Sequence, residues 1–598
     1  MKTLKKRSQI AVEDTWNLEA MYETNDAWEV EYKEVEEQCQ QFKEWEGKLK
    51  ESPEGLKKAL DEYSDIERRF EKLIVYANQR SNEDAGNSLY QKLVMRADTL
   101  GLKISGNTSF FYPEILSLGK EWLENAMKEN EELRFYERMI RELLRHEEHT
   151  LSKEMENVLA EAMPLGQAAK NIYSMFNNAD IRFPKIKNEK GEEVQLTNGT
   201  YGMLIESPDR LVREAAFKAL YSSYSAFKNT VASIFTSNLK QAAFFAKVRK
   251  YSSSRAYYLD DANIPESVYD NLIDTVHKNM SLMHRYVALR KKMLGVDELH
   301  MYDVYVPLLA DITKEYTFEE AKEVVLEGLK PMGEEYIELL KEGFSSRWID
   351  VYENEGKRTG AYSWGCYDSF PYVLLNYNGS LDNVFTLAHE MGHSLHSYYS
   401  RKNQPYIYSG YKIFVAEVAS TCNEAILIHY MLEKAESKEE KLYLLNHFLE
   451  KFKGTLYRQT MFAEFEKIVH QKAEAGEALN TEALCDIYKK LNEQYFGPEM
   501  IIDDEISLEW MRIPHFYTPF YVYQYATGFS AAIALSSRIL KEGAPAIEDY
   551  KKFLKGGGSM DSIDLLKIAG VDMTTADPIQ KALNVFEETL SQMEELCK

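Results

Sequence analysis

The feature that most constrains this chain is the stretch LAHEMGHSLH at residues 387–396, where three histidines and a glutamate lie among apolar residues. If the stretch is helical, His389 and His393 lie about 40° apart around the axis and one turn apart along it, so both imidazoles can grip one ion. Glu390 projects about 100° from His389, which suits contact with a water on that ion. The alternative is a histidine pair that only packs in a core.

A third ligand is available on the next predicted helix, FVAEVASTCNEAI at residues 414–426. Glu417 lies on this helix, and the small residues at 419–421 allow it to approach another helix closely. Glu424 follows two turns later on the same face, where it is either a partner that fixes an imidazole of the metal site or a surface carboxylate. His396 lies about 10 Å beyond His389 along the axis, so we expect it to pack or to support the site.

The segment WMRIPHFYTPFYVYQYATGFSAA at residues 510–532 carries a further candidate group. Two prolines flank a loop that contains His515, and Tyr521, Tyr523 and Tyr525 follow at the start of a predicted helix. Tyrosine hydroxyls and an imidazole are suitable donors to the oxyanion of a tetrahedral intermediate. Packing in an aromatic core is the alternative for any single tyrosine, and spacing alone does not choose among the three.

Length and charge exclude several classes of protein. A chain of 598 residues exceeds the size of one hydrophobic core, so we expect at least two packed lobes. The net charge of −24 argues against nucleic acid as a partner. The sequence lacks a run of 18 apolar residues, so a membrane span is not expected. The basic start of the chain is followed by polar and acidic residues where a signal peptide would need an apolar stretch. The cysteines are scattered, as expected of reduced thiols, and both features together predict a cytoplasmic protein.

Helical periodicity dominates the chain, with two breaks. Residues 181–202 predict a hairpin that turns at 188–191. Residues 348–379 predict a small antiparallel sheet, within which GAYSWG at 360–365 is a candidate edge strand for an extended peptide or, alternatively, part of a lid that only packs. The glycines of 556–559 lack the spacing of a phosphate-binding loop and predict a connector between helices.

Four motifs in this order resemble one known family. They are LAHEMGHSLH, FVAEVAST, IPHFYTPFYVYQYATG and FLKGGGSMDSIDLLKIAGVDM, and together they cover most of residues 200–580. The chain resembles the thimet oligopeptidase family of zinc metallopeptidases, and its oligoendopeptidase F group most closely. The resemblance implies a mostly α fold of two helical lobes that enclose a deep substrate channel, with a small antiparallel sheet near the active site. It further implies a helical N-terminal oligopeptidase domain at 1–195 and a zinc-metallopeptidase catalytic domain at 196–598.

The resemblance also implies roles for single residues. It assigns one Zn²⁺ per chain to His389, His393 and Glu417, with Glu390 as the general base. It assigns oxyanion donors to His515 and a later tyrosine, and the family's spacing favours Tyr525 over Tyr523. The implied substrates are short oligopeptides cut at internal bonds.

Two other functions remain open at this point. A carboxypeptidase or dipeptidase on the same scaffold would need a fixed cation for a chain end, and Arg358 and Arg512 are available. A helical di-iron protein would need two Glu-x-x-His helices, which the chain does not show, and a protein that only sequesters peptides would have no use for Glu390. The sequence does not indicate an oligomeric state.

Overall fold

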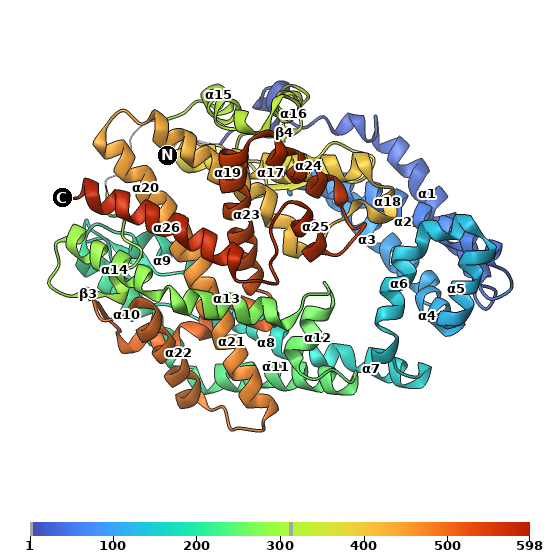
Figure 1. Ribbon diagram of the computed structural model, residues 1–598, viewed down its shortest axis with the longest axis horizontal. Coiled ribbons are helices and arrows are strands. Elements are labelled where there is room, and N and C mark those ends of the chain that lie inside the picture. The colour runs from blue at the N-terminus through green and yellow to red at the C-terminus, as the bar shows by residue number, and fades with distance from the viewer. Residues whose placement is uncertain (1–3, 310–314) are drawn as a thin grey trace. The chain divides into compact units, whose positions relative to one another are not determined.

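The computed structural model describes residues 4–309 and 315–598, and its helices and strands are labelled in Figure 1. Two compact units divide the chain, and each is assembled from three separate stretches. Unit 1 comprises Met1–Glu148, Lys314–Tyr430 and Leu535–Gly570, and unit 2 comprises His149–Thr313, Met431–Ala534 and Val571–Lys598. These units are defined by packing and differ from the expected consecutive domains, so the boundary at 195 stays a prediction.

Helices account for most of both units, which confirms the mostly α fold class. In unit 1 the helices are α1 (Asn25–Phe42), α2 (Pro53–Glu83), α3 (Ser88–Thr108), α4 (Phe111–Leu118), α5 (Lys120–Glu129), α6 (Glu137–Arg145), α15 (Phe318–Gly328), α16 (Glu334–Ser345), α17 (Leu381–Asn403), α18 (Tyr406–Ser409), α19 (Ile413–Lys434, which continues into unit 2), α24 (Ala544–Gly556) and α25 (Ser562–Ile568). No helix of the described residues has both the length and the apolar character that crossing a membrane requires.

The long helix α2 shows why the first part of the chain folds as it does. Ser52 caps the helix by accepting a hydrogen bond from the Gly55 N–H, and Pro53 occupies the first turn, where its missing N–H costs nothing. Apolar residues recur along one face and are buried against α1 and α3. The resulting core is centred on Trp16, Trp28 and Tyr76 and also includes Tyr372 of the small sheet. The first helices of the chain and the sheet beside α17 therefore share one hydrophobic core.

The small sheet of unit 1 has three strands, β4 (Ile349–Asp350), β5 (Tyr362–Trp364) and β6 (Tyr372–Leu374). The expectation of an antiparallel sheet is wrong in part, because β6 pairs antiparallel with β5 but parallel with β4. The order β4-β6-β5 explains the difference, since the chain passes from β4 to the far edge before it returns between the two strands. This topology leaves β5 as an edge strand, as the GAYSWG stretch predicted.

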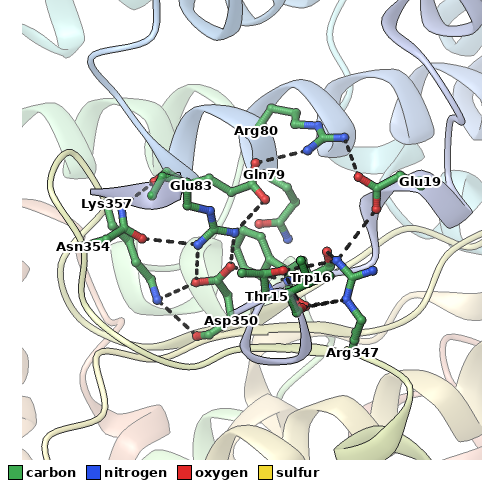
Figure 2. Close-up of polar contacts among 12 residues, drawn as sticks. Thr15, Trp16, Glu19, Gln79, Arg80, Glu83, Arg347, Asp350, Asn354 and Lys357 are labelled. Carbon is green, nitrogen blue, oxygen red and sulfur yellow. Dashed lines mark hydrogen bonds and ion pairs between the residues drawn. The ribbon is translucent and has the colours of Figure 1, made fainter. Parts of the chain in front are cut away.

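A buried group of charges joins the N-terminal segment to this sheet (Figure 2). The Asp350 side chain at the end of β4 accepts hydrogen bonds from both terminal nitrogens of Arg7, one of them at 2.9 Å. Lys357 Nζ lies 2.7 Å from Asp350 Oδ1, and both side chains are fully buried. Arg7 also donates to Glu83 at the end of α2. Burial lowers the pKa of Lys357, and the charge of Asp350 opposes this shift.

Because Asp350 is the counterion that Arg7 and Lys357 share, Asp350→Asn should leave the buried charge of Lys357 without a carboxylate partner. We expect the variant to lose about 3–5 kcal/mol of unfolding free energy, measured by urea denaturation. The matched control is Asp368→Asn, which removes one partner of the Arg68–Asp368 pair, whose side chains are 42% and 33% exposed. The control should lose less than about 1 kcal/mol, and equal losses in the two variants would contradict a special role for Asp350.

Unit 2 is also helical. Its helices are α7 (Lys153–Gly166), α8 (Ala168–Met175), α9 (Asn198–Ile205), α10 (Arg210–Ser225), α11 (Lys228–Val248), α12 (Ser254–Asp260), α13 (Glu266–Lys278), α14 (Met280–Leu294), α20 (Lys438–Lys451), α21 (Arg458–Glu474), α22 (Thr481–Phe496), α23 (Tyr523–Glu542, which continues into unit 1) and α26 (Asp577–Leu596). The hairpin expected at 181–202 is confirmed as β1 (Lys185–Lys187) and β2 (Glu193–Gln195), with Gly191 at a φ of +75° in the turn. A short parallel pair, β3 (Leu299–His300) and β7 (Met500–Ile501), completes the strands of the described residues.

The glycine-rich stretch at 556–559 is confirmed as a connector, because α24 ends at Gly556 and α25 begins at Ser562. Gly557 has a φ of +52°, and a Cβ at this position would collide with the carbonyl oxygen of Tyr408. The Gly558 N–H donates to that same carbonyl at 2.7 Å. The glycines therefore allow a close contact with the segment that follows α17.

Candidate metal centre

The two histidines of the HEMGH stretch share one face of α17. The helix begins after Ser380, whose side chain accepts a hydrogen bond from the Asn383 N–H, and it runs without a break to Asn403. The ring centres of His389 and His393 are 4.8 Å apart, and their planes are almost perpendicular at 82°. The spacing of four residues has therefore produced the arrangement that a two-imidazole clamp requires.

The third candidate ligand is held in place by a close crossing of α17 and α19. Gly392 lies where the two helices meet, and a Cβ at this position would approach the Cα of Ser420 to 2.6 Å and the carbonyl of Ala419 to 2.9 Å. The Asn423 side chain strengthens the crossing, because its Nδ2 donates to the Ala388 carbonyl at 3.0 Å. The small residues of α19 thus pack against a glycine of α17, Gly392. Sequence reasoning missed the role of this glycine.

This crossing brings Glu417 to both histidines. Glu417 Oε2 lies 3.3 Å from His389 Nε2 and 3.5 Å from His393 Nε2. The ligand atoms of the three residues all lie within 4.8 Å of one another, so the group could hold a metal ion. Two imidazole nitrogens and one carboxylate oxygen fit the donor preferences of Zn²⁺, and three protein ligands leave a position open for water or substrate.

The pKa values of these residues report strong negative charge at the site. Burial lowers the pKa of His389, but hydrogen bonds to Glu417 and Glu424 outweigh it and raise the pKa to about 10. Burial raises the pKa of Glu417, yet the two histidines hold it well below its usual range. These side chains thus stabilise a positive charge between them. A divalent cation would supply that charge in place of the proton on His389.

Glu424 contacts the other nitrogen of His389. Its Oε1 lies 2.5 Å from His389 Nδ1, whereas His389 Nε2 faces Glu417. An ionised carboxylate only accepts hydrogen bonds, so Nδ1 donates to Glu424, and Nε2 is the nitrogen that would bind an ion in place of the proton that it shares with Glu417. The structure therefore favours the supporting position for Glu424 over a place on the surface.

Glu390 lies beside the ligands and is not one of the three grouped residues. It is 7% exposed, and its Oε2 forms no hydrogen bond within the described residues. Burial raises the pKa of its carboxyl group. A buried carboxylate with an unused oxygen and a raised pKa is chemically suited to accept a proton.

His396 has a different environment. The residue is fully buried, its ring stacks on Tyr411 at 3.8 Å, and it also packs near Phe553. Burial lowers the pKa of its imidazole to about 3. His396 is therefore a neutral packing residue, even though it shares a face of α17 with His389.

The crossing at Gly392 can be tested by adding one methyl group. Gly392→Ala should push α19 away from α17 and separate Glu417 from the histidines. The affinity for an added divalent metal ion should fall at least about tenfold, and stability should fall by about 1–3 kcal/mol. Competition with a chromophoric chelator measures the affinity. The matched control is Gly106→Ala in α3, where a Cβ has open space. Unchanged affinity in Gly392→Ala would contradict the steric argument.

The candidate oxyanion donors lie together in unit 2. His515 is exposed, its ring centre is 6.0 Å from that of Tyr525 and 6.2 Å from that of Tyr521, and the two tyrosines are 5.5 Å apart. Tyr523 is 2% exposed, and its ring packs on Tyr269 at 5.1 Å. Tyr523 therefore belongs to the core of unit 2, whereas Tyr525 is grouped with His515. The metal ligands belong to unit 1, so the two groups are described separately.

Glu466 and His470, two buried residues of α21, contact Phe520, which lies between His515 and Tyr525. Sequence reasoning missed both. Phe520 has a φ of +55°, a strained value for a residue with a side chain. Its N–H donates to Glu466 Oε1 at 3.0 Å, and its ring packs on His470 at 4.6 Å. Glu466 is 1% exposed, and burial raises its pKa to about 8, although the hydrogen bond from Phe520 opposes the shift.

The raised pKa of Glu466 predicts a pH-dependent stability. The folded protein keeps the proton on Glu466 up to about pH 8, whereas the unfolded chain releases it near its ordinary pKa of 4.5. Stability therefore falls as the pH rises between these values and levels off above pH 8. Glu466→Gln removes this dependence, so the unfolding free energy of the variant minus that of the wild type should grow by about 4 kcal/mol between pH 5 and 8. Urea denaturation at several pH values measures the difference.

The matched control is Glu482→Gln, which alters an exposed carboxylate on α22 of the same unit. A change at an exposed site should shift the unfolding free energy by less than about 0.5 kcal/mol across the pH range. A flat difference for Glu466→Gln would show that the carboxyl group is ionised in the folded state.

Comparisons with known proteins identify the family of this chain. The model of peptidase family M3 matches residues 203–585, and the model described as oligopeptidase F matches residues 114–183. The chain belongs to peptidase family M3. It is therefore a peptidase, and the His389, His393 and Glu417 group lies within the region that the M3 model covers.

Relatives of this M3 peptidase extend over the full chain. Oligopeptidase PepF of Bacillus subtilis is 50% identical over 99% of this chain and 88% of the relative. Group B oligopeptidase PepB of Streptococcus agalactiae is 42% identical over 99% of this chain and 98% of the relative. The crystal structure of oligoendopeptidase-F from Enterococcus faecium is 42% identical, has a TM-score of 0.76, and covers 96% of this chain and 99% of its own.

Proposed function

We propose that this M3 peptidase is a zinc-dependent endopeptidase that hydrolyses internal bonds of short oligopeptides. The observation that carries the proposal is the group of His389, His393 and Glu417 on α17 and α19. Beside this group lies the Glu390 carboxylate, whose Oε2 forms no hydrogen bond within the described residues. The names of the relatives, oligopeptidase and oligoendopeptidase, support the substrate class. When bound at such a site, zinc supplies an acidified water and polarises a carbonyl group.

His389, His393 and Glu417 would hold the ion, and Glu424 would keep His389 in the tautomer that binds it. Glu390 would take a proton from the attacking water and give it to the leaving amine. Its unused Oε2 and its buried position support this role. A buried carboxylate is a stronger base than one in water, because loss of hydration destabilises its charged form.

His515 and Tyr525 would donate hydrogen bonds to the developing oxyanion. Their mutual proximity and partial exposure support this pairing over one that uses the buried Tyr523. The edge strand β5 would hold the substrate in an extended form through backbone hydrogen bonds, which are largely indifferent to sequence. Ser363 of β5 is linked to α17 by a 2.8 Å contact between its Oγ and that of Ser394, next to His393.

The role of Glu390 can be separated from metal binding. Glu390→Gln should lower kcat by at least about 10³-fold while the protein retains one zinc per chain, because the amide cannot accept the proton but does not disturb the ligands. Internally quenched peptides measure turnover, and elemental analysis measures zinc. The contrasting variant is His393→Ala, which should lose both metal and activity. Full activity in Glu390→Gln would refute the mechanism.

The two tyrosines provide a second matched test. Tyr525→Phe should lower kcat by about 10²–10³-fold with little change in KM, because the hydroxyl would act on the transition state. Tyr523→Phe alters a residue of the unit 2 core and should change kcat less than about threefold. A large loss from Tyr523→Phe with none from Tyr525→Phe would reverse the assignment.

The cleavage position distinguishes the proposal from a carboxypeptidase or dipeptidase. A chain-end enzyme would need a fixed cation, but Arg512 stacks on Tyr201 at 4.8 Å and Arg358 is an exposed residue near Tyr362. The direct experiment is a length series of quenched peptides, each prepared both blocked at its two ends and unblocked, with and without chelator. Internal cleavage that stops with chelator supports the endopeptidase, and cleavage only of unblocked peptides would favour the exopeptidase.

A further inference from the structure

A cavity in unit 1, which we call the α2 pocket, lies beyond the metal ligands along α17. Its volume is about 530 Å³, and its walls come from α2, α4, α6, β5, α17 and the segment 406–411. This size is within the range of sites that hold small molecules or several side-chain groups. Figure 1 shows α18 beside α2, two elements that are far apart in the sequence.

The α2 pocket shares helix α17 with the candidate metal centre, and its β5 wall contacts that helix. Ser397 lines the pocket and follows His393 by four residues, about 6 Å along the helix axis, and Arg401 lies about 12 Å along it. The β5 residue Ser363, which contacts Ser394 next to His393, also lines the pocket. An extended peptide advances about 3.3 Å per residue. A substrate on β5 would therefore reach the pocket two to four residues from its scissile bond.

The charges that line the pocket are unbalanced. Glu67 and Glu71 project into it from α2, and Arg401 is the one guanidinium among the residues that form its wall. Arg401 is near Glu71 and donates from Nη2 to the Gly365 carbonyl at 2.8 Å. Glu71 accepts from the Tyr367 N–H at 3.2 Å. Glu67 forms no ion pair within the described residues, but the Tyr63 hydroxyl donates a hydrogen bond to it, and burial together with the charge of Glu71 raises the pKa of its carboxyl group. With both glutamates ionised, two carboxylates face one guanidinium. One negative charge is left in excess.

Aromatic rings complete the wall around these carboxylates. The ring centres of Tyr63 and Tyr112 are 5.4 Å apart in an edge arrangement, and Tyr406 lines the pocket from the segment after α17. The face of a phenol ring attracts a cation, so these rings add to the attraction of the carboxylates. A neutral apolar ligand would offer Glu67 and Glu71 no countercharge, which makes it the poorer fit.

The pocket is also held in shape by contacts on its outer side. The Tyr408 hydroxyl donates to the Phe135 carbonyl at 2.8 Å, and the Tyr408 carbonyl accepts from the Gly558 N–H. The Ser400 hydroxyl donates to the Ser409 carbonyl at 2.6 Å. These contacts fix the segment 406–411 against three other parts of unit 1, so a ligand would not have to order this wall on binding.

We propose that the α2 pocket is a subsite for a cationic group of the peptide substrate, with Glu67 and Glu71 as its specificity-determining residues. The group is a lysine or arginine side chain, or a free amino terminus, two to four residues from the scissile bond. The proposal rests on the proposed function, because it assumes that a peptide lies along β5.

The test compares pairs of peptides that differ in one charge. Blocked, internally quenched peptides carry lysine or its neutral analogue norleucine at each of four positions on either side of the scissile bond. Wild-type enzyme should cleave the lysine peptide with a kcat/KM at least tenfold above that of norleucine at one of these positions. In Glu67→Gln combined with Glu71→Gln, the ratio should fall to about one. A free-amino-terminus series against an acetylated series shows whether the preference follows a side chain or the chain end.

The control is Asp65→Asn, an exposed carboxylate on the same helix that does not line the pocket. It should leave the lysine to norleucine ratio unchanged, which excludes a long-range effect of net charge. Binding of the same pairs, measured by fluorescence anisotropy with the Glu390→Gln protein, should show the same ratio without turnover. A ratio near one at all positions in the wild type, or a ratio that survives the double substitution, would overturn the proposal.

Failure of the proposed function would look different. In that case the wild type would cleave neither peptide of a pair, and the binding measurement alone would test whether the pocket binds a cationic group. Tenfold tighter binding of the lysine peptide that disappears in the double variant would support a cation site in a protein without this activity. Equal binding of both peptides would contradict the proposed subsite.

Discussion

The close crossing of α17 and α19 is the interaction on which the rest of the site depends. A metal centre built on one helix has only two ligands, because residues four apart share a face and the next turn lies too far along the axis. The third ligand must come from another helix, and Glu417 is short. It reaches the histidines because Gly392 meets the backbone of Ser420 without an intervening side chain. The same approach places Glu424 against His389 Nδ1, so one contact between backbones positions both the ligand and its support.

Burial gives the residues of this region their different properties. His389 and His396 lie on the same helix, yet neighbouring carboxylates raise the pKa of His389 and burial lowers that of His396. Burial favours the neutral form of both imidazoles, and only nearby charge reverses that preference. The same balance operates where Asp350 lies between Arg7 and Lys357 and ties the start of the chain to the sheet of unit 1. Buried charge is thus compensated at this structural position of unit 1, whereas the α2 pocket brings two carboxylates together with one guanidinium.

Much of the candidate site could be read from spacing alone. The helix at α17, the pairing of His389 with His393, the helix that carries Glu417, and the hairpin at 185–195 all follow from local periodicity and turn chemistry. The direction of β4 did not follow, because its partner strand is chosen by the route of the chain and not by its own residues. The roles of Gly392, Asn423 and Glu466 were missed for a similar reason, since each acts on the backbone of a residue distant in sequence.

The sequence by itself determined the class of fold, the two imidazoles on one helix face and the acidic character of the chain, because each depends on residue type and short-range spacing. Only the tertiary structure decided which of three tyrosines is buried, which histidine is neutral, and which carboxylate supports His389. These properties depend on the neighbours that surround a side chain after folding. Packing of segments hundreds of residues apart also created the α2 pocket, where α2 and the end of α17 meet in one wall. A cavity has no signature in the order of residues, because it is formed by what the packed elements leave unfilled.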